Sequence, residues 1–438
     1  MPRHAYRASL LDFHQDATKV GLDGDGAKVA SHIRFVDDGL LIVEDGKIAY
    51  AGAFEEELIN GDTVHDFRGK IICPGFIDTH IHYPQMEMIC AYGEQLLDWL
   101  KTYTFPTERK YSDKTYAREM AMICIRELFK NGTTTAAVFC TVHPESVDAF
   151  FEVAETHNML VIAGKVLMDR NAPEYLQDTP ERAYDESKAL IEKWHGRGRC
   201  LYAITPRFAP TSTAAQLEAA GRLRREFPDV FVHTHLAENK AEVEWVQELF
   251  PEARSYFDVY KRFGLTGRRC IFAHCIHLDD TDMHEFSDSR SVAAFCPTSN
   301  LFLGSGLLPL QRMREMHVLL TLGTDVGAGT SFSMFQTFHD AYKVSQLQGA
   351  KLSVEEGLYM ATLGAAHALG LDDRIGNLDV GKDADFVMLD PTATELQQLR
   401  WATPSPLSDR LFTLFMLGDH HNIFRTYVHG AEVYARSS

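Results

Sequence analysis

Residues 74–82 of the chain read Pro-Gly-Phe-Ile-Asp-Thr-His-Ile-His. The apolar residues that lead into this segment predict a strand over residues 71–79, directly followed by two closely spaced histidines. Alternate residues of a strand point to the same side, so His80 and His82 present their imidazoles to one point. Neutral imidazole is a common zinc ligand. The segment therefore indicates either a metal site or two ordinary polar residues at the end of a strand.

Seven more strand-like apolar runs follow this segment along the chain. They lie at residues 133–139, 160–168, 201–206, 230–235, 270–275, 291–296 and 319–324. Amphipathic segments such as 116–131, 147–157 and 214–227 separate these runs and predict helices. Strands that alternate with helices favour a parallel sheet. Eight such units predict an α/β protein with a (β/α)8 TIM barrel over residues 71–375, and a doubly wound open sheet is the alternative.

The two ends of the chain show a different pattern, in which short apolar runs alternate with turn residues. Residues 40–50 predict a β-hairpin, and residues 384–389 and 426–429 predict two further strands. We therefore expect a small β-sandwich domain that is built from both termini. Its N-terminal part covers residues 1–70, and its C-terminal part covers residues 376–438.

Polar residues end three more of the predicted strands. His235, His274 and Asp325 lie at the ends of the fifth, sixth and eighth strand-like runs. The carboxyl ends of barrel strands form the catalytic face, so these side chains meet the first two histidines only if the ring closes. Three histidines and one aspartate, with room for a water molecule, describe a catalytic zinc site with an open position. The predicted fold and the predicted metal site therefore support each other.

Glu238 lies three residues after His235, just beyond the end of the predicted strand. A carboxylate at this point can take a proton from a water molecule and pass it to a substrate. The alternative is a solvent-exposed glutamate at the start of a helix, where the helix dipole favours a negative charge. Of the other histidines, His233 is expected to pack behind the site, and His143 and His277 are expected either to support the site or to be structural.

The composition limits the partners and the compartment of the protein. The chain carries a net charge of −18 and has a pI of about 5.5, and an acidic surface repels nucleic-acid phosphates. The sequence has no apolar run of about 18 residues to span a membrane, and its start lacks the apolar stretch of a signal peptide. The eight cysteines form no CxxC pair, as in reduced cytoplasmic proteins. We expect a cytoplasmic protein that acts on a small molecule, without nucleic-acid or membrane partners.

Several motifs resemble those of the guanine deaminases, a family within the amidohydrolase superfamily. The superfamily motifs lie at residues 74–82 and 381–387. Segments that resemble the guanine deaminases more specifically lie at residues 82–85, 97–100, 103–108, 205–208, 235–239, 296–300 and 323–329. The resemblance covers nearly the whole chain. It implies hydrolysis of guanine to xanthine and ammonia in purine catabolism, and it implies a homodimer.

The resemblance also assigns roles to individual residues. It implies one zinc ion per subunit, held by His80, His82, His235 and Asp325. It implies that Glu238, Asp325 and His274 are catalytic. It implies that the substrate contacts Gln85, Arg207, Phe208, His235 and His274. The chemistry agrees, because an arginine offers a fixed fork of donors to a purine carbonyl and a phenylalanine can pack against an aromatic ring.

Alternatives to this assignment concern the metal count, the substrate and the loss of activity. A binuclear hydrolase of the superfamily would carry a lysine at the end of the fourth strand, but residues 203–207 contain none and Lys165 lies one strand earlier. This favours a single metal ion. A related amino-purine, a pterin or a triazine is an alternative substrate on the same scaffold. A catalytically inactive relative that serves as a scaffold is a second alternative, and the complete set of predicted site residues argues against it.

Overall fold

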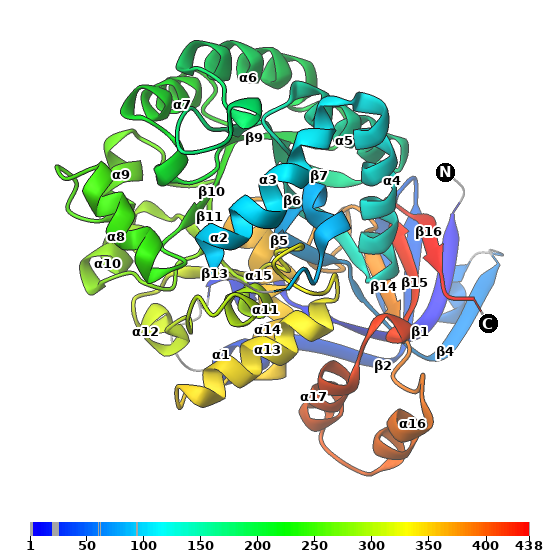
Figure 1. Ribbon diagram of the computed structural model, residues 1–438. Helices are drawn as coiled ribbons and strands as arrows, with labels where there is room; N and C mark the ends of the chain where they lie inside the picture. Colours follow the sequence, from blue (N-terminus) through cyan, green and yellow to red (C-terminus); the bar gives the residue numbers. More distant parts are fainter. Residues whose placement is uncertain (1–2, 20–25, 60, 62, 93–94, 438) are drawn as a thin grey trace.

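The computed structural model describes residues 3–19, 26–59, 61, 63–92 and 95–437. Figure 1 shows a ring of strands surrounded by helices, with a separate sheet beside it that contains both ends of the chain. Helix α4 contacts strands β15 and β16 of that sheet. The architecture therefore has the two parts that the sequence predicts.

Eight parallel strands form the ring, and each pairs with its neighbours in chain order. They are β5 (Phe76–His82), β6 (Thr133–Phe139), β7 (Leu160–Gly164), β9 (Cys200–Pro206), β10 (Phe231–Leu236), β11 (Cys270–His274), β12 (Val292–Phe295) and β13 (Leu319–Leu322). The short strand β8 (Val166–Leu167) pairs with β9 beside this path. The predicted TIM barrel is confirmed, although the predicted strand at 160–168 is divided between β7 and β8.

Side-chain and loop hydrogen bonds close the ring between its first and last strands. The hydroxyl of Thr79 on β5 donates to the carbonyl oxygen of Leu322 on β13 at 2.9 Å. The carboxylate of Asp78 accepts bonds from the amide and the hydroxyl of Thr324, at 3.0 and 2.5 Å. The amide of Asp325 donates to the carbonyl oxygen of His80 at 2.8 Å. These bonds exclude the open-sheet alternative and bring the two ends of the predicted metal site together.

Helices follow most barrel strands and cover the outside of the ring (Figure 1). The longer ones are α4 (Lys114–Lys130), α5 (Pro144–Thr156), α6 (Pro180–Trp194), α7 (Ala214–Glu226), α8 (Lys240–Leu249), α10 (Asp280–Ser289), α13 (Met334–Leu347) and α17 (Leu407–Leu417). The shorter ones are α1 (Gly26–Ala30), α2 (Leu96–Trp99), α3 (Phe105–Glu108), α9 (Tyr256–Arg262), α11 (Pro297–Phe302), α12 (Leu310–Glu315), α14 (Val354–Met360), α15 (Leu363–Leu369) and α16 (Glu395–Ala402). Single turns are η1 (Gln15–Lys19), η2 (Glu56–Ile59), η3 (Tyr83–Met88), η5 (Arg109–Ser112), η6 (Glu174–Leu176), η7 (Ala209–Thr211) and η8 (His420–Asn422), and η4 (Leu100–Thr104) is a π-helix. Within the described ranges, no helix combines the length and the apolar character needed to cross a membrane.

Strands from both termini form one seven-stranded mixed sheet in the order β16-β15-β14-β4-β1-β2-β3. They are β1 (His4–Phe13), β2 (Ile33–Glu44), β3 (Lys47–Ala53), β4 (Val64–Pro74), β14 (Phe386–Leu389), β15 (Ile423–Val428) and β16 (Ala431–Ala435). The predicted hairpin is the antiparallel pair β2–β3. The terminal domain is confirmed, but its strands join in a single sheet and do not form the two separate sheets of a sandwich.

The predicted strand at 71–79 is divided between the two sheets. Residues up to Pro74 pair in the terminal sheet as part of β4, and β5 begins in the barrel at Phe76. The chain changes sheets at Gly75, where a Cβ would lie 2.1 Å from the hydroxyl of Thr134. Only a residue without a side chain fits this close approach. The apolar run is continuous because both halves are buried, so apolar character alone does not reveal the division.

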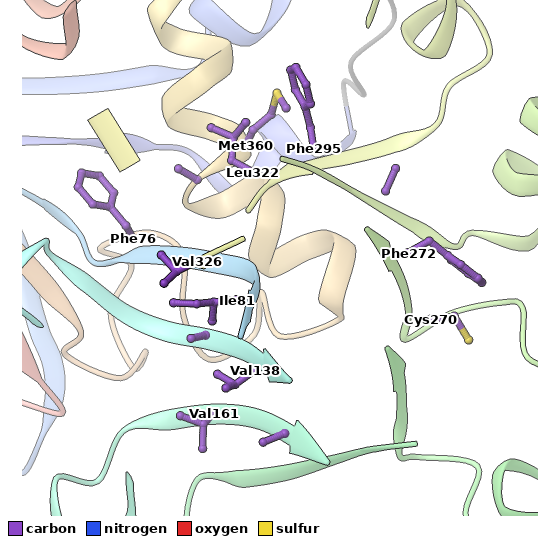
Figure 2. Packing of buried hydrophobic residues seen from close by; sticks show 14 of the residues in the cluster. Phe76, Ile81, Val138, Val161, Cys270, Phe272, Phe295, Leu322, Val326 and Met360 are labelled. Atoms are coloured by element: carbon purple, nitrogen blue, oxygen red, sulfur yellow. The ribbon is translucent and has the colours of Figure 1, made fainter. Parts of the chain in front are cut away.

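The barrel strands alternate between two hydrophobic clusters, as the period of a strand requires. On β11, Cys270 and Phe272 belong to the cluster that faces the surrounding helices, whereas Ile271 and Ala273 belong to the cluster inside the barrel. Figure 2 shows side chains of the first cluster, which several strands share. Both faces of the strands are therefore buried, and the polar residues at their carboxyl ends stand out from an otherwise apolar framework.

Candidate active site

Five of the predicted residues meet at the carboxyl ends of the barrel strands. Ligand atoms of His80, His235, His274 and Asp325 all lie within 4.8 Å of one another. The Nε2 atom of His82 lies 3.1 Å from that of His235 and 3.5 Å from a carboxylate oxygen of Asp325. Strands β5, β10 and β11 and the turn after β13 supply these side chains. The predicted convergence is therefore present in the structure.

Hydrogen bonds on the far side of three imidazoles aim their Nε2 atoms at this centre. Nδ1 of His80 lies 2.8 Å from Nε2 of His233, and Nδ1 of His235 lies 2.7 Å from the carbonyl oxygen of Arg207. Nδ1 of His274 lies 2.8 Å from the side-chain oxygen of Asn300. Such bonds hold the ring orientation of metal-binding histidines. His233 thus lies behind the site, where the sequence analysis placed it.

The donor atoms fit a metal ion. Burial lowers the pKa values of His80, His82 and His235, so these imidazoles are neutral and keep a lone pair. Burial raises the pKa of Asp325, but His80, His274 and Ser299 together outweigh burial, and the net pKa lies below the ordinary value. Nε2 of His80 is buried and has no hydrogen-bond partner among the described residues. Neutral imidazoles around a carboxylate form a suitable ligand set for a divalent cation.

Glu238 is buried beside this centre and is held from two directions. The hydroxyl of Ser305 donates to one carboxylate oxygen at 2.8 Å, and Nε2 of His274 lies 3.4 Å from the other. Burial raises the pKa of Glu238, which makes it easier for this carboxyl group to hold a proton near neutral pH. The cap of helix α8 is formed by Asn239 together with Glu242 in a capping box. Glu238 precedes this cap and is buried, so it is not the solvent-exposed helix-start glutamate of the alternative interpretation.

The site opens into a cavity at the carboxyl ends of the barrel strands. Predicted residues in its lining are His82, Gln85, Arg207, Phe208, His235, Glu238, His274 and Asp325. His143 and His277 do not belong to the described lining, and Nε2 of His277 lies 3.0 Å from the carbonyl oxygen of Ser305. The cavity thus joins the predicted metal site to the residues that the resemblance assigns to purine binding.

The sequence analysis missed the apolar roof of the cavity. Leu96, Trp99 and Leu100 line it from α2 and the start of η4. Figure 1 shows α2 in front of the ring of strands. Leu303 and Ala328 complete the apolar lining. Residues 97–100 were included in a family motif but received no role, because a short apolar segment does not reveal which part of the barrel it covers.

The sequence analysis also missed Glu108, at the end of α3. Its carboxylate is buried and accepts hydrogen bonds from Nη1 of Arg207, at 3.0 and 2.8 Å. It also accepts a bond from the side-chain amide of Gln85 at 3.2 Å. The segment 103–108 was noted as a family motif, and an acidic residue in that motif was the available signal.

The barrel and its cluster of histidine, aspartate and glutamate define a class of hydrolase, and comparison with known proteins agrees. The model of the amidohydrolase family matches residues 71–433, and the chain belongs to this family. Within the family, it groups with the guanine deaminases. It is 56% identical to the guanine deaminase of Escherichia coli (strain K12) over 413 residues, which cover 94% of each protein.

Solved structures give the same grouping. The guanine deaminase from Bradyrhizobium japonicum is 38% identical and has a TM-score of 0.95, with the whole of both chains covered. A guanine deaminase from C. acetobutylicum with guanine bound in its active site is 29% identical and has a TM-score of 0.88. That match covers 99% of this chain and 100% of the other. The similarity thus extends over the barrel, the terminal sheet and the segment that roofs the cavity.

Proposed function

We propose that this protein hydrolyses guanine to xanthine and ammonia. The observation that carries the proposal is one cavity in which Gln85, Arg207 and Phe208 lie beside Glu238 and His274. The first group offers a fork of donors, an amide and an aromatic face, which suit a purine. The second group offers a carboxyl and an imidazole for proton transfer. The names of the similar proteins, and the guanine bound to one of them, support the same substrate.

The proposed cofactor is one zinc ion per subunit, held by His80, His82, His235 and Asp325. When bound, zinc activates a water molecule by lowering its pKa toward neutrality. His274 belongs to the same compact group of ligand atoms, but its Nε2 also lies 3.4 Å from Glu238. We assign His274 to the substrate and the attacking oxygen rather than to the metal.

In the proposed reaction, the water oxygen bonds to C2 of guanine and the bond from C2 to the amino nitrogen breaks. Glu238 takes one proton from the water and delivers it to the ring nitrogen beside C2, and the other proton leaves on ammonia. Asp325 orients the water as a hydrogen-bond acceptor. His274, held by Asn300 on its far side, stabilises the negative charge that develops on the attacking oxygen.

The cavity walls position the substrate and exclude bulk water. Phe208 is 4% exposed and packs against a face of the purine in this proposal. Trp99 is also buried, and its Nε1 has no hydrogen-bond partner among the described residues, so this donor is available to a purine acceptor. Leu96 and Leu100 cover the remaining side. An apolar roof strengthens the hydrogen bonds and charges beneath it.

The test is loss of guanine absorbance with equal release of ammonia by the zinc-loaded protein, run beside adenine, cytosine and a pterin. Selective conversion of guanine to xanthine is the expected result. Turnover of another amino-heterocycle in its place would keep the scaffold and overturn the choice of substrate. Absence of both metal and ammonia release would favour a scaffold protein.

We also propose that the protein acts as a homodimer in the cytoplasm. The resemblance to the family supports the dimer, and the eight cysteines, which are all unpaired, suit a reducing compartment. Light scattering on the purified protein tests the first proposal, and cell fractionation tests the second. A monomer at micromolar concentration or a secreted protein would contradict them.

A further inference from the structure

The two polar residues assigned to purine binding are held by one buried carboxylate. Glu108 is 0% exposed. Its Oε1 atom accepts bonds from Nη1 of Arg207 at 3.0 Å and from Nε2 of Gln85 at 3.2 Å, and its Oε2 atom accepts from the same Nη1 at 2.8 Å. Gln85 and Arg207 line the cavity, whereas Glu108 is not among the described lining residues. Glu108 therefore acts on the cavity through its two neighbours.

The charge of Glu108 decides the orientation of the Gln85 amide. A glutamine side chain offers a donor at one end and an acceptor at the other, and the two orientations occupy nearly the same space. A carboxylate only accepts hydrogen bonds, so Nε2 of Gln85 must face Glu108. The other end of the amide, Oε1, lies 3.4 Å from the backbone amide of Gly327. The acceptor of Gln85 is therefore on the side away from Glu108.

The same carboxylate binds one end of the Arg207 guanidinium. Arginine has five N–H donors in a fixed plane and has no acceptor. With Nη1 bound to Glu108, the remaining donors are those of Nε and Nη2. The cavity wall thus presents donors from Arg207 next to an acceptor from Gln85. This order complements a ring carbonyl beside a ring N–H, which is the lactam edge of guanine. Adenine carries an amino donor and a ring acceptor at the same positions, in the reverse order.

We propose that Glu108 is a positioning residue that makes the site selective for 6-oxopurines, by fixing the orientation of Gln85 and Arg207. The inference rests on the proposed function and adds the chemical feature by which the substrate is recognised. A purely structural ion pair would also stabilise Arg207, because a buried guanidinium needs a partner. The two roles differ in what they affect: the structural role changes stability, whereas the positioning role changes which purine binds.

The test uses Glu108→Gln, which keeps the shape but offers one acceptor and one donor. Arg207 can only donate, so its guanidinium bonds to the amide oxygen of the new side chain. The NH2 group of that side chain then faces Gln85, and the Gln85 amide reverses to present its oxygen. We expect KM for guanine to rise about 10- to 100-fold, the cost of a mismatched buried hydrogen bond, and kcat to fall by a smaller factor. The Ki of hypoxanthine, a 6-oxopurine without the 2-amino group, should rise by the same factor as KM. Glu108→Asp keeps an acceptor-only group and should recover part of the binding.

A matched control is Glu356→Gln, which weakens another buried carboxylate–arginine pair. Oε1 of Glu356 lies 2.8 Å from Nη2 of Arg314, and neither residue is in the described lining of the cavity. We expect this variant to lose stability and to keep the KM of the wild-type protein. An unchanged KM and Ki in Glu108→Gln, or equal rises in both variants, would overturn the inference.

The wild-type protein supplies a measurement that does not depend on folding of a variant. Recognition of a lactam edge predicts that hypoxanthine inhibits at least about 10-fold more strongly than adenine. Equal inhibition by the two bases would overturn the inference even if guanine is the substrate. Absence of guanine turnover by the wild-type protein would instead overturn the proposed function, so the two failures are distinguishable.

Discussion

Replacement of Glu238 by glutamine tests the proposed proton transfer with little change in shape. The hydroxyl of Ser305 donates to Oε1 of Glu238 at 2.8 Å, and an amide oxygen at the same position accepts this bond equally well. The side chain is buried, so the change removes a negative charge without exposing the site to water. The amide cannot accept the proton of a water molecule and return it to a ring nitrogen.

The expected loss follows from what such a group contributes. A positioned general acid or base accelerates a reaction by about 100- to 10,000-fold, which corresponds to about 3–5 kcal/mol of transition-state stabilisation. Glu238 performs both proton transfers in the proposed reaction, so we expect kcat to fall by at least the upper part of this range. KM should change little, because the contacts that hold the purine come from other residues.

The assay follows guanine absorbance and ammonia release, and elemental analysis of the same sample measures bound zinc. Glu244→Gln is the control, because Glu244 is exposed on the same helix α8 and should keep full activity. Turnover by Glu238→Gln within tenfold of the wild-type rate, with zinc bound, would refute the assignment of Glu238 as the proton carrier. Loss of zinc from the variant would show that Glu238 has a ligand role.

Four other substitutions test the metal site, the cavity and the junction of the two sheets. We expect His82→Ala to lose zinc during dialysis and His274→Ala to retain it without turnover; the reverse pattern in elemental analysis would exchange their roles. A Cβ at Gly327 would lie 2.5 Å from the carbonyl oxygen of Gln85, so Gly327→Ala should raise KM about 10-fold, and unchanged steady-state kinetics would contradict this. Arg199→Ala should lower the free energy of unfolding by about 3–5 kcal/mol, because it leaves the buried carboxylate of Asp385 without its arginine partner, whereas Asp383 keeps its ion pair with Lys47. A differential scanning calorimetry trace with an unshifted Tm would show that this network does not stabilise the protein.

The sequence predicts the barrel well because its signals are local and repeated. Each strand is a short apolar run, and four strands end in a residue that can bind a metal. The period of two places His80 and His82 on one side, and the structure keeps both beside Asp325. The need for ring closure then links residues from opposite ends of the barrel sequence. A prediction of this kind depends on patterns that each segment carries by itself.

The features that the sequence does not reveal are set by contacts between distant segments. Glu108 and Arg207 are 99 positions apart, and nothing in either segment alone indicates that they pair. Trp99 lies in a short apolar segment that is equally compatible with the core, and only its position over the barrel makes it part of the cavity. The division of the apolar run at Gly75 likewise depends on Thr134, which belongs to the next strand. Missing information about tertiary contacts, rather than weak local signals, explains these gaps.

Arg207 connects the two halves of the site through different parts of one residue. Its backbone carbonyl oxygen lies 2.7 Å from Nδ1 of His235 and thereby orients a proposed zinc ligand. Its guanidinium bonds to Glu108, and Arg207 lines the cavity on the side proposed to bind the purine. Because the carbonyl belongs to the main chain, the orientation of His235 does not depend on which side chain is present at position 207. The proposed metal-binding half of the site can therefore stay constant while side chains at position 207 and its neighbours change the heterocycle that is bound.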